Sequence, residues 1–79
     1  MYKNKYGERN NICGIKISNI RQSLNLSQRE LADRLQLAGI DLDKYAMQKI
    51  ESGKRFLTDI ELRAFAEIFG ITTDELYKM

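Results

Sequence analysis

The sequence predicts an all-α protein, a compact bundle of five short helices. Its 79 residues include no proline and only 5 glycines, a composition that suits helices better than a turn-rich β fold. Apolar residues recur at helical spacing. At three places a Ser or Thr stands three positions before a Glu, which is the signature of a helix start. A chain of this length forms one small domain.

The first residues differ from the rest of the chain. Residues 1–13 have no apolar period, so we predict a flexible N-terminal arm there and a folded domain over residues 14–79. Cys13 is the only cysteine, which excludes an intrachain disulfide, and we interpret it as a small apolar filler rather than a reactive thiol. Histidine, the usual acid–base group and metal ligand, is absent. We therefore expect no enzyme activity, no metal and no cofactor.

The first predicted helix spans about residues 15–24. Ile17, Ile20 and Leu24 fall on one face of it and form an apolar stripe. Arg21 lies next to that stripe, where a charged side chain needs a partner.

A capping box formed by Ser27 and Glu30 predicts the start of a second helix, over about residues 28–37. The inner stripe of this helix is expected to contain Leu31, Ala32, Leu35 and Ala38. Glycine and aspartate residues then break the pattern, which predicts a connecting loop.

The third predicted helix begins at Asp43 or Lys44 and ends at Ser52, with Gly53 just beyond it. Its side chains sort into two arcs. One arc is polar and basic and holds Lys44, Tyr45, Gln48 and Lys49; the other is apolar and holds Ala46, Met47 and Ile50. Glu51 intrudes on the apolar arc, as Arg21 does on the first helix. We therefore predict that Arg21 and Glu51 form a structural ion pair that is at least half buried.

Two further capping boxes predict the last two helices. Thr58 and Glu61 precede a helix over about residues 59–69, whose core face is expected to hold Leu62, Phe65, Ala66 and Phe69. Thr72 and Glu75 open a short terminal helix.

Charge is unevenly distributed along the chain. Six basic residues and one acidic residue give residues 1–29 a net charge of +5, whereas residues 30–43 carry −3. Residues 44–55 return to +3, and residues 56–79 fall to −3. Positive charge thus gathers on the N-terminal region and the third helix, as a phosphate-facing side requires, although an ordinary solvated surface is the alternative.

These elements resemble the lambda-repressor-like helix-turn-helix domains of the Cro and xenobiotic-response-element type. The resemblance covers about residues 14–77. The motifs that carry it are Ile17-x-x-Ile20-Arg21, Leu26-Ser27-Gln28-x-x-Leu31-Ala32, Met47-Gln48-Lys49-Ile50-Glu51-Ser52-Gly53-Lys54-Arg55 and Leu62-x-x-Phe65-Ala66-x-x-Phe69-Gly70-Ile71-Thr72-x-Asp74-Glu75-Leu76.

The resemblance implies sequence-specific binding to double-stranded DNA by a transcriptional regulator, a repressor, whose third helix enters the major groove. It implies internal pairing of Arg21 with Glu51 and base-edge contacts from Lys44, Tyr45 and Gln48. The phosphate contacts that we expect are Ser27, Gln28, Lys49, Lys54 and Arg55. An exposed side chain without a ligand is the alternative for each DNA contact. Related proteins usually bind palindromic operators as homodimers.

One departure from the family pattern lies between the second and third helices. The connection from Leu31 to Glu51 is about five residues longer than usual, which replaces the tight turn with a loop. Asp41 and Asp43 bring negative charge close to the expected DNA surface; we interpret them as caps, and a restriction on tolerated DNA sequences is the alternative.

A second function remains open, namely a protein-interaction module of the same fold, such as an antitoxin-like partner of a toxin. No run approaches about 18 apolar residues, so we expect no membrane span and no signal peptide, and a cytoplasmic location.

Overall fold

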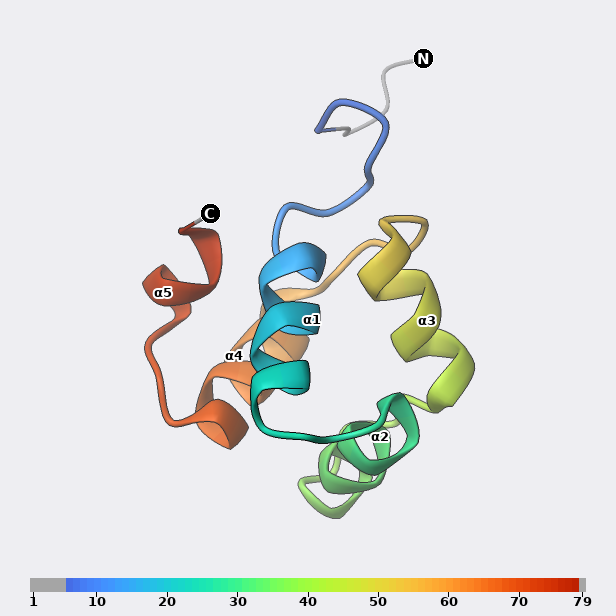
Figure 1. Cartoon of the computed structure of the whole chain (residues 1–79), viewed down its shortest axis with the longest axis vertical. Helices are drawn as coiled ribbons and strands as arrows, with labels where there is room; N and C mark the ends of the chain where they lie inside the picture. Colours follow the sequence, from blue (N-terminus) through green and yellow to red (C-terminus); the bar gives the residue numbers. More distant parts are fainter. Residues whose placement is uncertain (1–5, 79) are drawn as a thin grey trace.

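The computed structural model describes residues 6–78, in which five helices follow one another from Gly14 onward (Figure 1). They are α1 (Gly14–Ser23), α2 (Gln28–Leu37), α3 (Lys44–Ser52), α4 (Asp59–Phe69) and α5 (Thr73–Tyr77). No strand occurs between residues 6 and 78; an isolated bridge joins Tyr6 to Arg9. The prediction of a five-helix, all-α protein is confirmed.

Reciprocal hydrogen bonds begin α2 and α4. The Ser27 hydroxyl accepts from the Glu30 backbone N–H (3.0 Å), and the Glu30 carboxylate accepts from the Ser27 N–H (2.9 Å). Thr58 and Glu61 repeat the arrangement at 3.1 and 3.0 Å. Both predicted capping boxes therefore exist, and each satisfies backbone donors that the first helical turn leaves free.

The third predicted capping box is only half formed. The Thr72 hydroxyl accepts from the Glu75 N–H at 3.3 Å, as expected. The Glu75 carboxylate instead accepts from Nζ of Lys78, also at 3.3 Å. The ammonium group of Lys78, just after α5, therefore binds the carboxylate that was expected to accept from the Thr72 backbone N–H.

Two residues predicted to line the core are exposed. Leu24 is 49% exposed, because α1 ends at Ser23 and the chain then reverses through Asn25, whose φ is +58°. Leu26 is buried just after this reversal. Ala38 is exposed because α2 ends one residue before it.

The core takes side chains from every helix and from the connector between α2 and α3. Its largest fully buried members are Phe65, Ile17, Leu31, Leu35, Leu42, Met47, Ile50 and Leu76. Cys13 is buried with them, and this burial raises the pKa of its thiol. The interpretation of Cys13 as an apolar filler matches its position.

Arg21 and Glu51 are in direct contact and join α1 to α3. Arg21 Nε lies 2.7 Å from Glu51 Oε2, and Arg21 Nη2 lies 3.0 Å from Oε1. Two further bonds complete the cluster: Arg21 Nη1 donates to the Leu26 carbonyl (2.7 Å), and the Gln28 amide donates to Glu51 Oε1 (3.0 Å). The Arg21 and Glu51 side chains are only 13% and 8% exposed, so removal of either one strands a nearly buried charge.

The segment that precedes α1 differs from the predicted flexible arm. Residues 1–5 of that arm lie outside the described residues. Further along, the Asn10 backbone N–H donates to the Gly53 carbonyl (2.7 Å), and Asn11 and Cys13 are buried. Residues 9–13 are therefore part of the folded body, because the end of α3 offers carbonyls that this segment satisfies.

We predict that Arg21→Met lowers the free energy of unfolding by about 3 kcal/mol, because the Glu51 carboxylate then lies nearly buried without its cation. For a domain of this size the melting temperature should fall by roughly 10–20 °C. Thermal unfolding followed by circular dichroism measures the change. The matched control is Arg63→Met, which breaks an exposed ion pair with Glu67 and should change stability very little. A similar small shift for both variants would contradict the importance of the Arg21–Glu51 pair.

Candidate nucleic-acid interface

Local signals at both ends fix the position of α3. The Asp43 carboxylate accepts from the Ala46 N–H at 2.8 Å and caps the first turn. Gly53 ends the helix with a φ of +86°, in the left-handed region that glycine adopts without strain. Asp43 is thus the N-cap that we favoured from the sequence.

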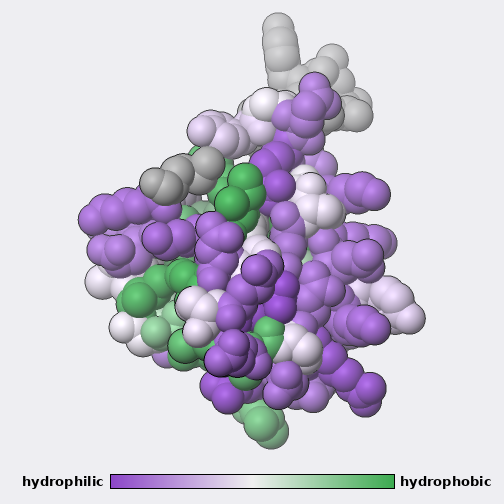
Figure 2. Space-filling view, viewed as in Figure 1, coloured by the Kyte–Doolittle hydropathy of each residue, from purple (hydrophilic) through white to green (hydrophobic). Residues whose placement is uncertain are grey.

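The two faces of α3 have opposite environments. Met47 and Ile50 are fully buried against the core. Lys44, Tyr45, Gln48 and Lys49 are all exposed, and Tyr45 reaches 67%. The side of the molecule that α3 occupies is almost entirely hydrophilic, whereas hydrophobic residues appear on the opposite side (Figure 2). We call Lys44, Tyr45, Gln48 and Lys49 the α3 strip.

The long connector between α2 and α3 leaves the α3 strip uncovered. It passes the end of α2 and enters α3 from below (Figure 1). Leu42 is buried and anchors it in the core, and the Gln36 amide donates to the Leu42 carbonyl at 3.2 Å. The connector reverses direction at Gly39, whose φ is +87°. Of the connector residues, Leu42 is buried and Ile40 is half-buried, whereas Ala38, Gly39 and Asp41 are exposed.

Shallow hollows flank Tyr45 on both sides of the strip. The hollow toward α2 is lined by Arg29, Ala32, Asp33, Gln36, Asp43, Lys44 and Tyr45. The hollow on the other side is lined by Asp43, Tyr45, Ala46, Lys49, Lys54, Arg55 and Phe56. The front of α3 is thus a ridge between two depressions, and each depression holds basic side chains.

Two of the lining residues were missed by the sequence analysis. Arg29 follows Gln28 on α2 and is exposed at the edge of the first hollow. Phe56 is 52% exposed in the second hollow, directly after the basic pair Lys54 and Arg55. Phe56 directly follows the basic pair Lys54 and Arg55 in the sequence, and this proximity was the signal available for it.

Two of the expected phosphate contacts already hydrogen-bond within the protein. The Gln28 amide donates to Glu51, which leaves one of its two N–H groups for another acceptor. The Arg55 guanidinium donates a hydrogen bond to each carboxylate oxygen of Glu61, both at 2.9 Å. Lys49 and Lys54 are exposed, and Ser27 is exposed at the capped start of α2.

Glu61 has an altered acidity because of this pairing. The Arg55 guanidinium, with the Thr58 backbone N–H, lowers the pKa of Glu61 although partial burial opposes the shift. The same contact raises the pKa of Arg55. Arg55 therefore holds the loop after α3 against the start of α4.

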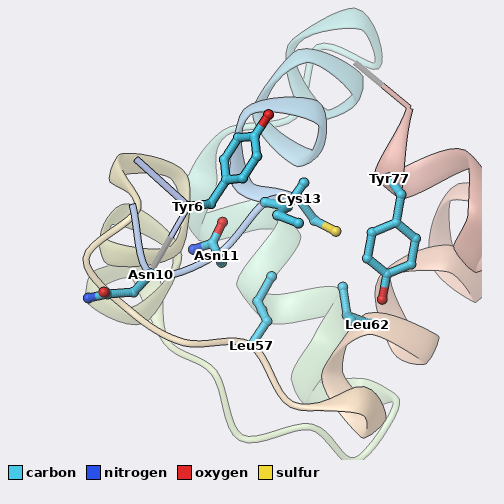
Figure 3. A pocket seen from close by; sticks show the side chains of 8 residues that line it. Tyr6, Asn10, Asn11, Cys13, Leu57, Leu62 and Tyr77 are labelled. Atoms are coloured by element: carbon cyan, nitrogen blue, oxygen red, sulfur yellow. The ribbon is translucent and has the colours of Figure 1, made fainter. Parts of the chain in front are cut away.

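A different hollow lies between the N-terminal segment, α4 and α5, away from the α3 strip (Figure 3). Leu57 and Leu62 form part of its lining, with Tyr6 and Tyr77 at its margins and the Cys13 sulfur turned toward Tyr77. Its lining is mainly apolar and includes none of the α3 strip.

Residues 6–78 contain neither a cluster of metal ligands nor a helix suited to a membrane. No group of three or more His, Cys, Asp or Glu side chains is arranged to hold a metal ion. No helix in that part of the chain is both long enough and apolar enough to cross a membrane.

In the comparison with protein families, residues 14–79 match the family described as helix-turn-helix domain. Because the match covers most of the chain, the protein belongs to the helix-turn-helix family, in agreement with the lambda-repressor-like resemblance. Comparisons with curated proteins and with solved structures gave no match. Helix-turn-helix domains bind DNA and regulate transcription, so DNA is the partner that the family indicates.

We predict that Glu61→Gln lowers stability at pH 7 by about 1 kcal/mol, because the charge-assisted bonds to Arg55 are weakened while the amide still caps Thr58. The lowered pKa of Glu61 means that its contribution is present above the ordinary carboxyl range and is lost as the pH falls through the folded-state pKa. The difference between wild type and variant should therefore shrink toward pH 3. Denaturant unfolding at several pH values tests this, with the exposed Glu67→Gln as control. A difference that stays constant with pH would contradict it.

Proposed function

We propose that this protein is a sequence-specific DNA-binding repressor that inserts α3 into the major groove of double-stranded DNA. The observation that carries the proposal is the α3 strip, whose four polar side chains are exposed while the opposite face of α3 is buried. An α-helix with its side chains is about 10–12 Å across, and the major groove is about 12 Å wide. The ridge of α3 therefore matches the groove in size.

The base contacts in this proposal come from the first two turns of α3. Lys44 donates to the O6 and N7 acceptors of guanine, and Gln48 pairs with the N6 and N7 atoms of adenine, since its amide both donates and accepts. Tyr45 stands at the crest between the two hollows and packs on a thymine methyl group or bonds a phosphate. Of these, Gln48 has the geometry for bidentate pairing, whereas a lone lysine discriminates less.

Phosphate contacts flank the base contacts and set the register of the protein on the duplex. Lys49 and Lys54 line the hollow on one side of the ridge and are exposed, so we assign them to the phosphates of one strand. On the other side Ser27 offers the N-terminus of α2, and Gln28 offers its remaining N–H. Arg55 contributes less than Lys54 because its guanidinium is bound to Glu61.

A single domain with so few contacts binds DNA weakly, so we propose that the functional unit is a homodimer on a palindromic operator. Two half-sites about one helical turn apart suit two copies of α3. We place the dimer surface near the last helix, with Leu76, Tyr77 and Met79 as candidates, or at the corner between the last two helices. Leu76 is buried in the core and Tyr77 remains exposed, whereas Met79 lies outside the described residues.

The direct test is selection of bound duplexes from a random DNA pool at a stated salt concentration. A palindromic consensus would support both sequence-specific binding and the dimer. Binding without enrichment of any sequence would contradict the base contacts. Absence of binding at low salt would favour the protein-interaction module, such as an antitoxin-like partner, as the function of this fold.

We predict that the double variant Lys44→Ala/Gln48→Ala keeps its fold and loses preference for the selected duplex. Each good base contact discriminates by roughly 1–3 kcal/mol, so the ratio of specific to nonspecific affinity should fall at least about tenfold. A fluorescence-anisotropy titration against selected and scrambled duplexes measures the ratio. The control is Arg63→Ala/Glu67→Ala on the outer face of α4, which should leave the ratio unchanged. Unchanged discrimination in the α3 variant would remove these residues from the base contacts.

Lys54→Ala should weaken binding to all duplexes alike and lower the slope of log affinity against log salt by about one ion. Arg55→Ala should change the slope by less, because its charge is already neutralised by Glu61. Titrations at four salt concentrations compare the two variants directly. Equal changes in slope would show that Arg55 leaves Glu61 to bind phosphate.

A further inference from the structure

The segment before α1 contacts the end of α3 through a dense set of hydrogen bonds. Arg9 Nη2 donates to the Glu51 carbonyl (2.9 Å) and the Ile50 carbonyl (3.3 Å). These carbonyls lie in the last turn of α3, where the helix has acceptors without helical partners. A guanidinium there also carries the charge that the negative end of the helix dipole favours.

Asn11 links three parts of the fold with one buried side chain. Its amide donates to the Ile50 carbonyl (3.0 Å) and to the Arg55 carbonyl (2.7 Å). Its side-chain oxygen accepts from the Gly14 N–H (2.8 Å) at the start of α1. Asn11 is only 8% exposed; its bonds to Ile50 and Gly14 are buried, and its bond to Arg55 is partly buried.

Asn10 hydrogen-bonds to the segment that follows α3, which contains Lys54 and Arg55 and which we call the basic loop. Its side-chain amide donates to the Lys54 carbonyl at 3.0 Å, and its backbone N–H donates to the Gly53 carbonyl at 2.7 Å. The side chains of Asn10 and Asn11 lie beside α3 and the chain that leaves it (Figure 3). The backbone of Lys54 and Arg55 is thus positioned by residues more than forty positions earlier in the sequence.

The contact is close enough to exclude side chains at two glycines. A Cβ on Gly53 would lie 2.8 Å from the Arg9 guanidinium carbon. A Cβ on Gly14 would collide with the Ile50 carbonyl oxygen. The start of α1 and the end of α3 therefore meet at backbone distance, and the Arg9 side chain packs directly on the backbone of Gly53.

We propose that Arg9, Asn10 and Asn11 are positioning residues for DNA recognition, a latch that sets α3 and the basic loop in one fixed relation. The latch acts through the end of α3, and its members bind protein carbonyls rather than DNA. The inference rests on the proposed function. A binding surface built from two segments gains affinity when both are held in the bound arrangement beforehand, because less ordering is then lost on binding.

The test variant is Arg9→Met, which removes the guanidinium and keeps an unbranched stem. Binding is measured below the thermal transition, where the variant is folded. If only about a tenth of the folded variant keeps α3 and the basic loop in the arrangement that binds DNA, its affinity for the selected duplex falls about tenfold. The salt slope should stay at the wild-type value, because the latch makes no phosphate contact; a drop of about one ion would mean that Arg9 binds phosphate and would overturn the proposal.

The matched control is Arg63→Met, which removes the same charge from the outer face of α4 and should retain wild-type affinity. A purely structural role for Arg9 would lower the melting temperature and leave the affinity of the folded variant unchanged, and this result would also overturn the proposal. If Arg9→Met does not fold, Arg9→Lys replaces it, since lysine keeps the charge and loses the paired geometry.

Amide hydrogen exchange separates this inference from the proposed function. The amides of Gly53, Lys54 and Arg55 bond back into α3 and report on its last turn. They should exchange faster in the Arg9 variant, whereas the amides of α2 should not; equal exchange would overturn the latch whatever the protein binds. If wild type selects no DNA sequence, the proposed function fails by itself. If wild type selects a duplex and the variant binds it equally well, only the inference fails.

Discussion

The nearly buried ion pair between Arg21 and Glu51 is the contact on which the arrangement of the first three helices depends. Arg21 binds the carboxylate with two nitrogens and the Leu26 carbonyl with a third, while Gln28 on α2 reaches the same carboxylate. One cluster therefore joins α1, the start of α2 and α3. Such a pair adds little net stability compared with apolar residues of the same size. Its value lies in orientation, because the planar fork of an arginine and a carboxylate permits few relative positions.

The α3 strip is exposed because the opposite side of the helix is the one that packs against the rest of the protein. Met47 and Ile50 are buried, Glu51 is held by the ion pair, and the end of the helix is held by Asn11. The interface that we propose is therefore a helix rather than a loop, and rigid elements hold contact residues more accurately. The longer connector is compatible with this arrangement because Leu42 draws it into the core beneath the helices. Family membership indicates DNA as the partner, and the α3 strip, which is exposed, is the surface that we propose for its binding.

Most of the fold could be predicted because its signals are local. Capping pairs such as Ser27 and Glu30, a glycine such as Gly53 and the apolar period all act within one or two turns. The partner of Arg21 was predictable because both charges lay on apolar stripes. Contacts between distant polar groups leave no such pattern, so the bonds of Asn11 to the end of α3 were missed. Arg55 was assigned to phosphate without its Glu61 partner, since the turn between them sets their separation. The burial of Leu26 in place of Leu24 depended on a left-handed Asn25, which sequence period does not reveal.

The burial of Cys13 has a practical consequence. Its side chain is only 2% exposed, and burial raises the pKa of its thiol, whereas alkylating reagents need access to the sulfur and attack the thiolate. A cysteine introduced on the outer surface will therefore react with a maleimide dye well before the native one. A fluorescent reporter can be attached to this protein at a chosen surface position while the native sequence of the core is kept.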